Sequence, residues 1–106
     1  GGINIDAAAT NIVVTNTISN GSTGSGYYVN ASSTIFNNVT AINNAVAGFL
    51  FDNSAINAIV KLSTSTNNGI GLLINALAQN IDVVDSTVEN NVSVDIDDNS
   101  SSLNIT

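Results

Sequence analysis

A repeat of about 23 residues runs through the 106 residues of the chain and limits the folds open to it. Each copy holds a short apolar segment that ends in Asp or Asn, and four of the copies begin with Gly. The five segments are Gly2-Ile3-Asn4-Ile5-Asp6, Gly26-Tyr27-Tyr28-Val29-Asn30, Gly48-Phe49-Leu50-Phe51-Asp52, Gly71-Leu72-Leu73-Ile74-Asn75 and Ser93-Val94-Asp95-Ile96-Asp97. Successive copies follow one another at almost equal steps along the chain. A period of this length indicates a solenoid or another repeat array.

Two more features recur with the same step. One is an Asn column whose members are almost evenly spaced, made of Asn20, Asn44, Asn67 and Asn90. The other is a strand that is clearest at 81–83 and 103–105, with earlier copies at 58–60 and 35–37. Its first copy, between Asn11 and Val14, is ambiguous by one residue. The repeat therefore predicts three short strands in each copy.

The composition favours strands over helices. Val, Ile and Thr make up 34 of the 106 residues, and their branched side chains suit a pleated sheet. A propeller blade needs about 40 residues, and a leucine-rich repeat needs more Leu than the six present. The chain is 43% hydrophobic with a mean hydropathy of +0.29, so it can bury a core. We predict one all-β domain over residues 1–106.

The pattern Gly-apolar-x-apolar-Asp/Asn, followed by apolar-x-x-Asn, resembles the right-handed parallel β-helix superfamily with the pectate-lyase-like fold. The resemblance covers nearly the whole chain. It implies a single-domain parallel β-helix, or β-solenoid, of about 4.5 coils with three parallel sheets. It implies an architecture rather than an activity, because such folds carry many unrelated functions.

Stacked coils predict two polar ladders and a core. Equivalent residues lie about 4.8 Å apart in parallel coils, so carboxylates and amides would alternate in a turn ladder of Asp6, Asn30, Asp52, Asn75 and Asp97. An amide can donate to an acid on either side, although Asp and Asn are also interchangeable turn residues. The Asn column would form an internal amide ladder. The inward core pairs would be Ile3/Ile5, Tyr27/Val29, Phe49/Phe51, Leu72/Ile74 and Val94/Ile96.

The residues that are missing exclude several functions. There is no Cys and no His, which excludes thiolate chemistry, Ser-His-Asp catalysis and Cys/His zinc sites. One Lys stands against eight acids, and the net charge of −7 excludes nucleic acid as a partner. The longest apolar run, 45–51, is far shorter than the about 20 residues of a membrane span. We predict no membrane span.

Catalysis is not expected. Enzymes with the pectate-lyase-like fold act on acidic polysaccharides through a basic residue, calcium-binding Asp residues or clustered Asp residues. The only base here is Lys61, and a solvated, outward-facing Lys is the favoured interpretation. Most of the acids lie near the C-terminal end, between Asp82 and Asp98. A calcium site at Asp95, Asp97 and Asp98 is the alternative to a solvated acidic edge, and no other cofactor is expected.

Six Asn-x-Ser/Thr sequons suggest a glycosylated surface protein. They lie at Asn20, Asn30, Asn38, Asn91, Asn99 and Asn104. A chain this rich in Asn, Ser and Thr contains about four by chance, so the signal for glycosylation is weak.

Two surfaces are predicted to mediate assembly. The outward residues of the first strand in each copy are Asn4, Tyr28, Leu50, Leu73 and Asp95, because they alternate with the inward ones. The apolar stripe of Tyr28, Leu50 and Leu73 predicts a lateral interface. Solenoids normally carry capping elements, and none is visible in this sequence. The axial interface is therefore predicted at the open edges, at Ile3, Ile5, Leu103 and Ile105.

These features predict a structural subunit of an extracellular filament or surface layer. Copies of the chain would stack head to tail, so that the protein forms a homopolymer of itself. The alternatives are a fragment of a carbohydrate-binding or polysaccharide-degrading β-helix protein, or of an adhesin stalk. Carbohydrate is then a further candidate partner. Each alternative places the molecule outside the cell or at its surface.

Overall fold

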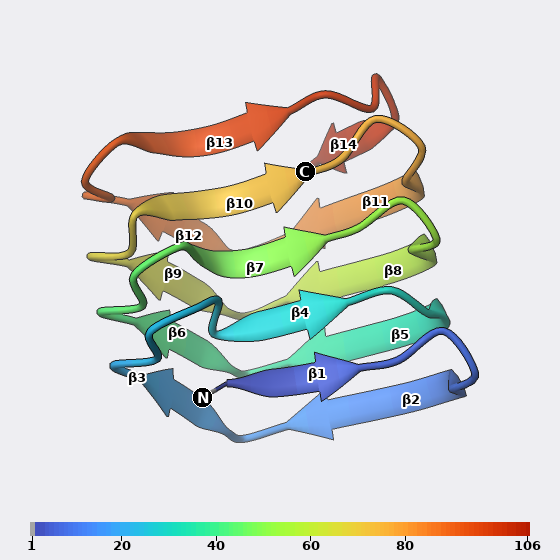
Figure 1. Ribbon diagram of the computed structural model, residues 1–106, viewed down its shortest axis with the longest axis horizontal. Coiled ribbons are helices and arrows are strands. Elements are labelled where there is room, and N and C mark those ends of the chain that lie inside the picture. The colour runs from blue at the N-terminus through green and yellow to red at the C-terminus, as the bar shows by residue number, and fades with distance from the viewer. Residues whose placement is uncertain (1) are drawn as a thin grey trace.

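The computed structural model describes residues 2–106, and Gly1 lies outside the described residues. Fourteen strands wind into a parallel β-helix whose coils are stacked along one axis (Figure 1). They are β1 (Ile3–Ile5), β2 (Thr10–Thr15), β3 (Ile18–Asn20), β4 (Tyr27–Val29), β5 (Ser32–Asn37), β6 (Thr40–Ile42), β7 (Ala47–Phe51), β8 (Ile56–Lys61), β9 (Thr64–Thr66), β10 (Ile70–Ile74), β11 (Gln79–Val84), β12 (Thr87–Glu89), β13 (Val94–Asp98) and β14 (Leu103–Ile105). The predicted all-β solenoid is confirmed.

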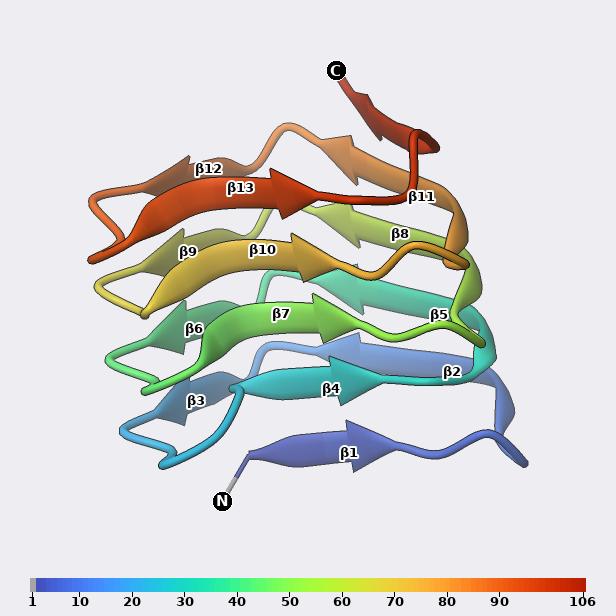
Figure 2. The ribbon, with the colours of Figure 1, turned by 45° about the horizontal axis from the view of Figure 1, so that its top comes forward.

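The strands form three parallel sheets, one on each side of the coil (Figure 2). The first sheet has the order β1-β4-β7-β10-β13, the second β2-β5-β8-β11-β14 and the third β3-β6-β9-β12. The chain moves up by one strand in each sheet per coil, so successive copies of the repeat become neighbours in space. Five, five and four strands correspond to the predicted number of about 4.5 coils.

Each coil turns three sharp corners through residues in the left-handed backbone conformation. Asn11, Ser33, Asn57, Asn80 and Ser101 lie at the corner between the first and second sheets. Asn16, Asn38, Leu62 and Asp85 form the next corner, and Gly21, Asn43, Asn67 and Asn90 form the third. This conformation costs most L-residues about 1–2 kcal/mol, whereas Gly and Asn adopt it more readily. The corners therefore account for eight of the 19 Asn residues.

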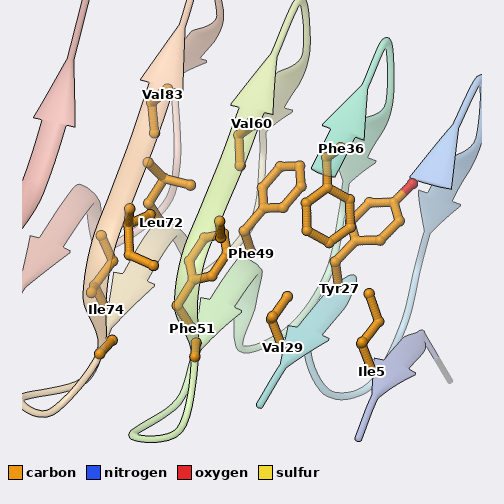
Figure 3. Packing of buried hydrophobic residues seen from close by; sticks show 14 of the residues in the cluster. Ile5, Tyr27, Val29, Phe36, Phe49, Phe51, Val60, Leu72, Ile74 and Val83 are labelled. Atoms are coloured by element: carbon orange, nitrogen blue, oxygen red, sulfur yellow. The ribbon is translucent and has the colours of Figure 1, made fainter. Parts of the chain in front are cut away.

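The inward side chains of the three sheets meet in one core (Figure 3). Tyr27 and Phe49 stack with their ring centroids 5.0 Å apart, and Phe36 packs edge-on at 5.2 and 5.3 Å from them. Such pairs each contribute about 0.5–1.5 kcal/mol beyond the burial of area. Burial raises the pKa of Tyr27, and its hydroxyl is hydrogen-bonded to Thr17 Oγ1 at 2.9 Å. The predicted core pairs of the second, third and fourth coils are confirmed.

A buried ladder of polar side chains runs parallel to the axis beside the first sheet. It consists of Ser22, Asn44, Asn68 and Asn91. Asn44 Oδ1 accepts the Ser22 N–H at 2.9 Å, Asn68 Oδ1 accepts the Asn44 N–H at 3.0 Å, and Asn91 Oδ1 accepts the Asn68 N–H at 3.0 Å. The side chains are also linked directly, since Asn44 Nδ2 donates to Asn68 Oδ1 at 2.9 Å. Each Asn therefore binds the backbone of the preceding coil.

Glycines stack beside this ladder because it leaves no room for a side chain. A Cβ atom at Gly48 would collide with Ser65 Oγ and lie 2.7 Å from Asn68 Nδ2. At Gly71 it would lie 2.5 Å from Asn91 Nδ2. The repeated Gly of the sequence thus marks a close approach of backbone to side chain.

The predicted Asn column is wrong at three of its four members. Asn44 is buried, but Asn20, Asn67 and Asn90 are exposed. In the upper coils the inward residue is the next one along the chain, Asn68 or Asn91. Adjacent Asn residues recur with the same period, so periodicity alone does not show which of them faces inward.

The fifth copy is shifted by two residues from its predicted alignment. Ile96 pairs with Leu72 in the parallel register between β13 and β10. Asn99, rather than Asp97, therefore follows Asn75 in the turn ladder, and the Asn99 N–H donates to the carbonyl that precedes Asn75. The alternation of carboxylates and amides ends at this coil.

The strand copy predicted at 35–37 is shifted by one residue. Phe36 pairs with Val60, so the copy is 34–36 and the fully buried Thr34 stands at an inward position. The ambiguous first copy is 12–14, since Ile12 pairs with Thr34 and Val14 with Phe36. Because Thr34 is polar, the inward positions of this strand do not show an apolar pattern in the sequence.

The ladder predicts different effects on stability for two neighbouring substitutions. Asn68→Asp replaces an amide that donates to the Ala41 carbonyl and Ser65 Oγ, both at 3.0 Å, with a buried acceptor. We expect the free energy of unfolding to fall by about 2 kcal/mol or more. Asn67→Asp changes an exposed side chain and leaves the urea midpoint near that of the parent chain. Equal midpoints for the two variants would contradict the ladder.

Leu62 is the one large apolar residue at a left-handed corner of the described chain, with φ 51° and an exposed fraction of 59%. Leu62→Asn relieves the backbone strain, so we expect it to raise the free energy of unfolding by about 1 kcal/mol. Leu77→Asn is the control, because Leu77 is equally exposed but does not have a positive φ. Denaturant midpoints compare the two, and a gain shared by both would point to lost surface hydrophobicity instead.

Candidate functional site

The outward stripe of the first sheet lies where the sequence predicts it over three coils. Tyr28, Leu50 and Leu73 stack directly on one another, and each is half-buried. Asn4 lies beside Tyr28 in β1. At the other end Leu73 pairs with Asp97, which corrects the prediction of Asp95 at this position. The stripe is an apolar surface between polar ends.

A hydrogen-bond network links Tyr28 to the turn ladder. The Tyr28 hydroxyl donates to Asp52 Oδ2, and Asn75 Nδ2 donates to Asp52 Oδ1 at 2.8 Å. Hydrogen bonds from Tyr28, Asn75 and the Asn53 N–H lower the pKa of Asp52, while the bond to Asp52 raises the pKa of Tyr28. Ionised Asp52 therefore stabilises the fold above its ordinary pKa, and this contribution is lost as the pH falls through the lowered value.

A second apolar surface, missed in the sequence, lies on the outer face of the second sheet. Val13, Ile35 and Ile59 stack there as register partners. Together with the corner residues Asn11, Ser33 and Asn57 they line a depression of about 200 Å³. In the sequence, this surface corresponds to the apolar residue that lies between the two inward residues of each strand. It can be recognised only when the register of the strands is known.

The three acids of the predicted calcium site each have a separate hydrogen-bond partner. Asp95 Oδ1 accepts the Asn91 N–H at 3.0 Å and Asn91 Nδ2 at 2.9 Å. These two bonds lower the pKa of Asp95. Asp98 Oδ1 accepts Ser100 Oγ at 2.6 Å, and Asp97 Oδ1 accepts from Asn99 Nδ2 at 3.3 Å. Within residues 2–106 no three acidic, His or Cys side chains gather into a metal-binding group.

Lys61 ends β8 with an exposed side chain. Its neighbours along the second sheet are Asn37 in β5 and Val84 in β11. Neither neighbour is an acid or a base. Lys61 therefore has no register neighbour with which it could exchange a proton.

The six sequons occupy different environments. Asn20, Asn38, Asn99 and Asn104 are exposed, whereas Asn30 and Asn91 are half-buried. Asn30 Oδ1 accepts the Ser54 N–H at 3.0 Å. Asn91 belongs to the buried ladder, where its side-chain amide accepts the Asn68 N–H and donates to the Ser65 carbonyl of the preceding coil. Glycosylation at these residues stays a prediction.

The predicted axial residues lie in strands with a single neighbour. β1 pairs only with β4, and β14 pairs only with β11. Ile3 and Ile105 are 38% and 53% exposed, Leu103 is half-buried, and Ile5 is buried. The two ends of the stack thus present apolar side chains beside unpaired strand edges.

The comparison with known families agrees with this architecture. Over residues 2–106 the structure has no helix that is long and apolar enough to cross a membrane. No curated protein and no solved structure matches the chain. A family profile described as a right-handed beta helix region matches residues 1–106. With a match over the full length and three parallel sheets wound around one axis, the chain belongs to the right-handed β-helix family.

Proposed function

We propose that this β-helix is a structural, non-catalytic unit that stacks head to tail with further copies of itself. The unpaired strand edges at the two ends of the stack carry the proposal. β1 and β2 present one edge, and β13 and β14 present the other. Each edge strand leaves backbone donors and acceptors without a strand partner on its outer side, which is a template for pairing with another chain.

The side chains at the first edge support docking of a second copy. Ile3 and Ile5 stand at the inward positions of β1, and Ile12 and Val14 at those of β2. None of these positions holds the Lys, Pro or inward charge with which natural sheets block edge pairing. Docking would bury these side chains as an additional coil does within the chain.

A structural role also agrees with the way the titratable groups are used. Asp52 is held by Tyr28 and Asn75, and Asp95 is held by Asn91. These carboxylates stabilise turns and ladders instead of converging on an open cleft. Lys61 stands apart from them in its own column. We place the molecule outside the cell, and the exposed sequons at Asn20 and Asn38 support this location.

Carbohydrate binding has less support from the structure. Sugars are commonly held against exposed aromatic rings, which supply an apolar face beside polar groups. The chain has five aromatic residues, and four of them are fully buried in the core. Only Tyr28 reaches the outer surface, where its hydroxyl is already bonded to Asp52.

Head-to-tail stacking predicts that one substitution at the edge prevents elongation. Ile105→Lys places a charge on β14, so we expect oligomers of the purified chain to be lost while the unfolding midpoint changes little. Ile3→Lys should act in the same way from the other edge, because it places a charge at an exposed inward position of β1. Sedimentation velocity over a concentration series measures the oligomers.

Leu77→Lys is the matched control for this experiment. It adds the same charge at an exposed turn in the fourth coil, away from both edges. We expect it to associate as the parent chain does. A parent chain that sediments as a monomer at every concentration contradicts head-to-tail stacking, and a loss of oligomers in the control as well would show an effect of net charge alone.

A further inference from the structure

The buried ladder ends inside the chain, at Asp95. In the lower coils each ladder N–H is accepted by the Asn side chain of the following coil, as Asn91 Oδ1 accepts the Asn68 N–H at 3.0 Å. For Asn91 this acceptor is Asp95 Oδ1, at 3.0 Å from the backbone nitrogen and 2.9 Å from Nδ2. Asp95 thus does for the last ladder residue what an added coil would otherwise do.

Asp95 also replaces a glycine that the ladder requires elsewhere. The register of β13 on β10 places it above Gly71. A Cβ atom at Gly71 would lie 2.5 Å from the Nδ2 of Asn91, the ladder residue that closes the same coil. A side chain at position 95 and a ladder Asn closing the fifth coil would therefore compete for one space. Asp95 therefore excludes a further ladder Asn of the kind that the lower coils contain.

A second acid of the same strand stands in a core column. Asp98 pairs with Ile74, whose side chain is fully buried, and the column continues through Phe51 and Val29 to Ile5. The Asp98 carboxylate is held by the Ser100 N–H at 2.9 Å and Ser100 Oγ at 2.6 Å. The Asp98 side chain is exposed in the last of the described coils.

The elements around Asp98 offer it no positive charge. The neighbouring strand β10 carries no charged side chain, β14 carries none, and the only acid of β11 is Asp82. Asp95 and Asp97 lie on β13 itself, and the one Lys of the chain is in β8. An added coil would bury the Asp98 carboxylate without a counter-ion, which costs several kcal/mol unless it becomes neutral.

We propose that β13 is a built-in stop, in which Asp95 closes the ladder and the charge of Asp98 limits the docking of a second copy on this edge. The proposal rests on the proposed head-to-tail stacking. It makes β13 the strand that limits how strongly copies stack. The opposite edge has no such groups, since Ile3, Ile5, Ile12 and Val14 occupy the inward positions there. The fifth coil lies at the opposite end of the stack from β1 (Figure 2). The two ends of the β-helix therefore differ in their side chains, and the proposal assigns the strength of the joint to the fifth coil.

Two substitutions with the same change in net charge test the stop at pH 7. Asp98→Asn removes the inward charge and retains the Oδ1 acceptor for Ser100. Asp97→Asn removes the charge of the adjacent outward residue. From concentration series in sedimentation velocity we expect the association constant of Asp98→Asn to exceed that of the parent chain at least about tenfold. Asp97→Asn should remain within about twofold.

The outcomes separate the stop from the stacking itself. Parent-like association of both variants, or an equal gain in both, overturns the stop and leaves head-to-tail stacking standing. A parent chain that is monomeric at every concentration overturns the stacking, and with it the proposed role of β13 in limiting that stacking.

A measurement on the monomer tests the ladder closure separately. Asp95→Gly restores the glycine of the column and removes the acceptor of Asn91. We expect the amide hydrogen of Asn91 to exchange at least about tenfold faster than in the parent chain, with no change in Asp97→Asn. Unchanged protection of the Asn91 amide in Asp95→Gly would overturn the role of Asp95, whatever the state of association.

Discussion

The spacing of the coils depends on hydrogen bonds that run parallel to the axis, and the amide ladder adds buried side-chain bonds to those between the backbones of the strands. A side-chain amide in a low-dielectric interior is strongly stabilising when paired and costly when left unpaired. Asn68 satisfies this requirement by accepting from the Asn44 backbone while donating to the carbonyl of Ala41. Two coils are thereby fixed at one separation. The glycine column beside the ladder follows from the same contact, because Gly48 and Gly71 leave the space that the amides fill.

The corners impose the second constraint, and together with the ladder they explain an unusual composition. Eight Asn residues hold left-handed corners and three more form the ladder, so backbone geometry accounts for 11 of the 19. Such a fold needs few charged residues, since its polar groups bond one another from coil to coil. Asn38 Nδ2 donates to Asn16 Oδ1 at 2.7 Å, and Asn80 Nδ2 to Asn57 Oδ1 at 2.8 Å. Amide ladders on the surface replace the ion pairs of an ordinary domain.

The period alone predicts the fold class, the three sheets and the apolar stripe of Tyr28, Leu50 and Leu73. It does not predict register within a coil. Adjacent Asn residues share one period, so only the side that the backbone turns inward distinguishes Asn68 from Asn67. The alignment of the fifth copy with the other four is also wrong, because the period does not fix its register.

In that copy Asp95 stands where the other strands have a glycine. The sequence does not show that the Asp95 carboxylate accepts the Asn91 N–H, as a ladder Asn does in the lower coils. A two-residue shift also preserves the alternation of inward and outward positions. In the proposed stack, the closing ladder would distinguish the contacts within one chain from those between copies. It begins with Ser22, whose Oγ accepts the Gly24 N–H at 3.2 Å, and it ends at Asp95. A joint between stacked copies would hold backbone bonds and apolar contacts without a shared amide column. If copies stack as proposed, each copy would be bound more tightly within itself than to its neighbour, and folded units could assemble and separate without unfolding.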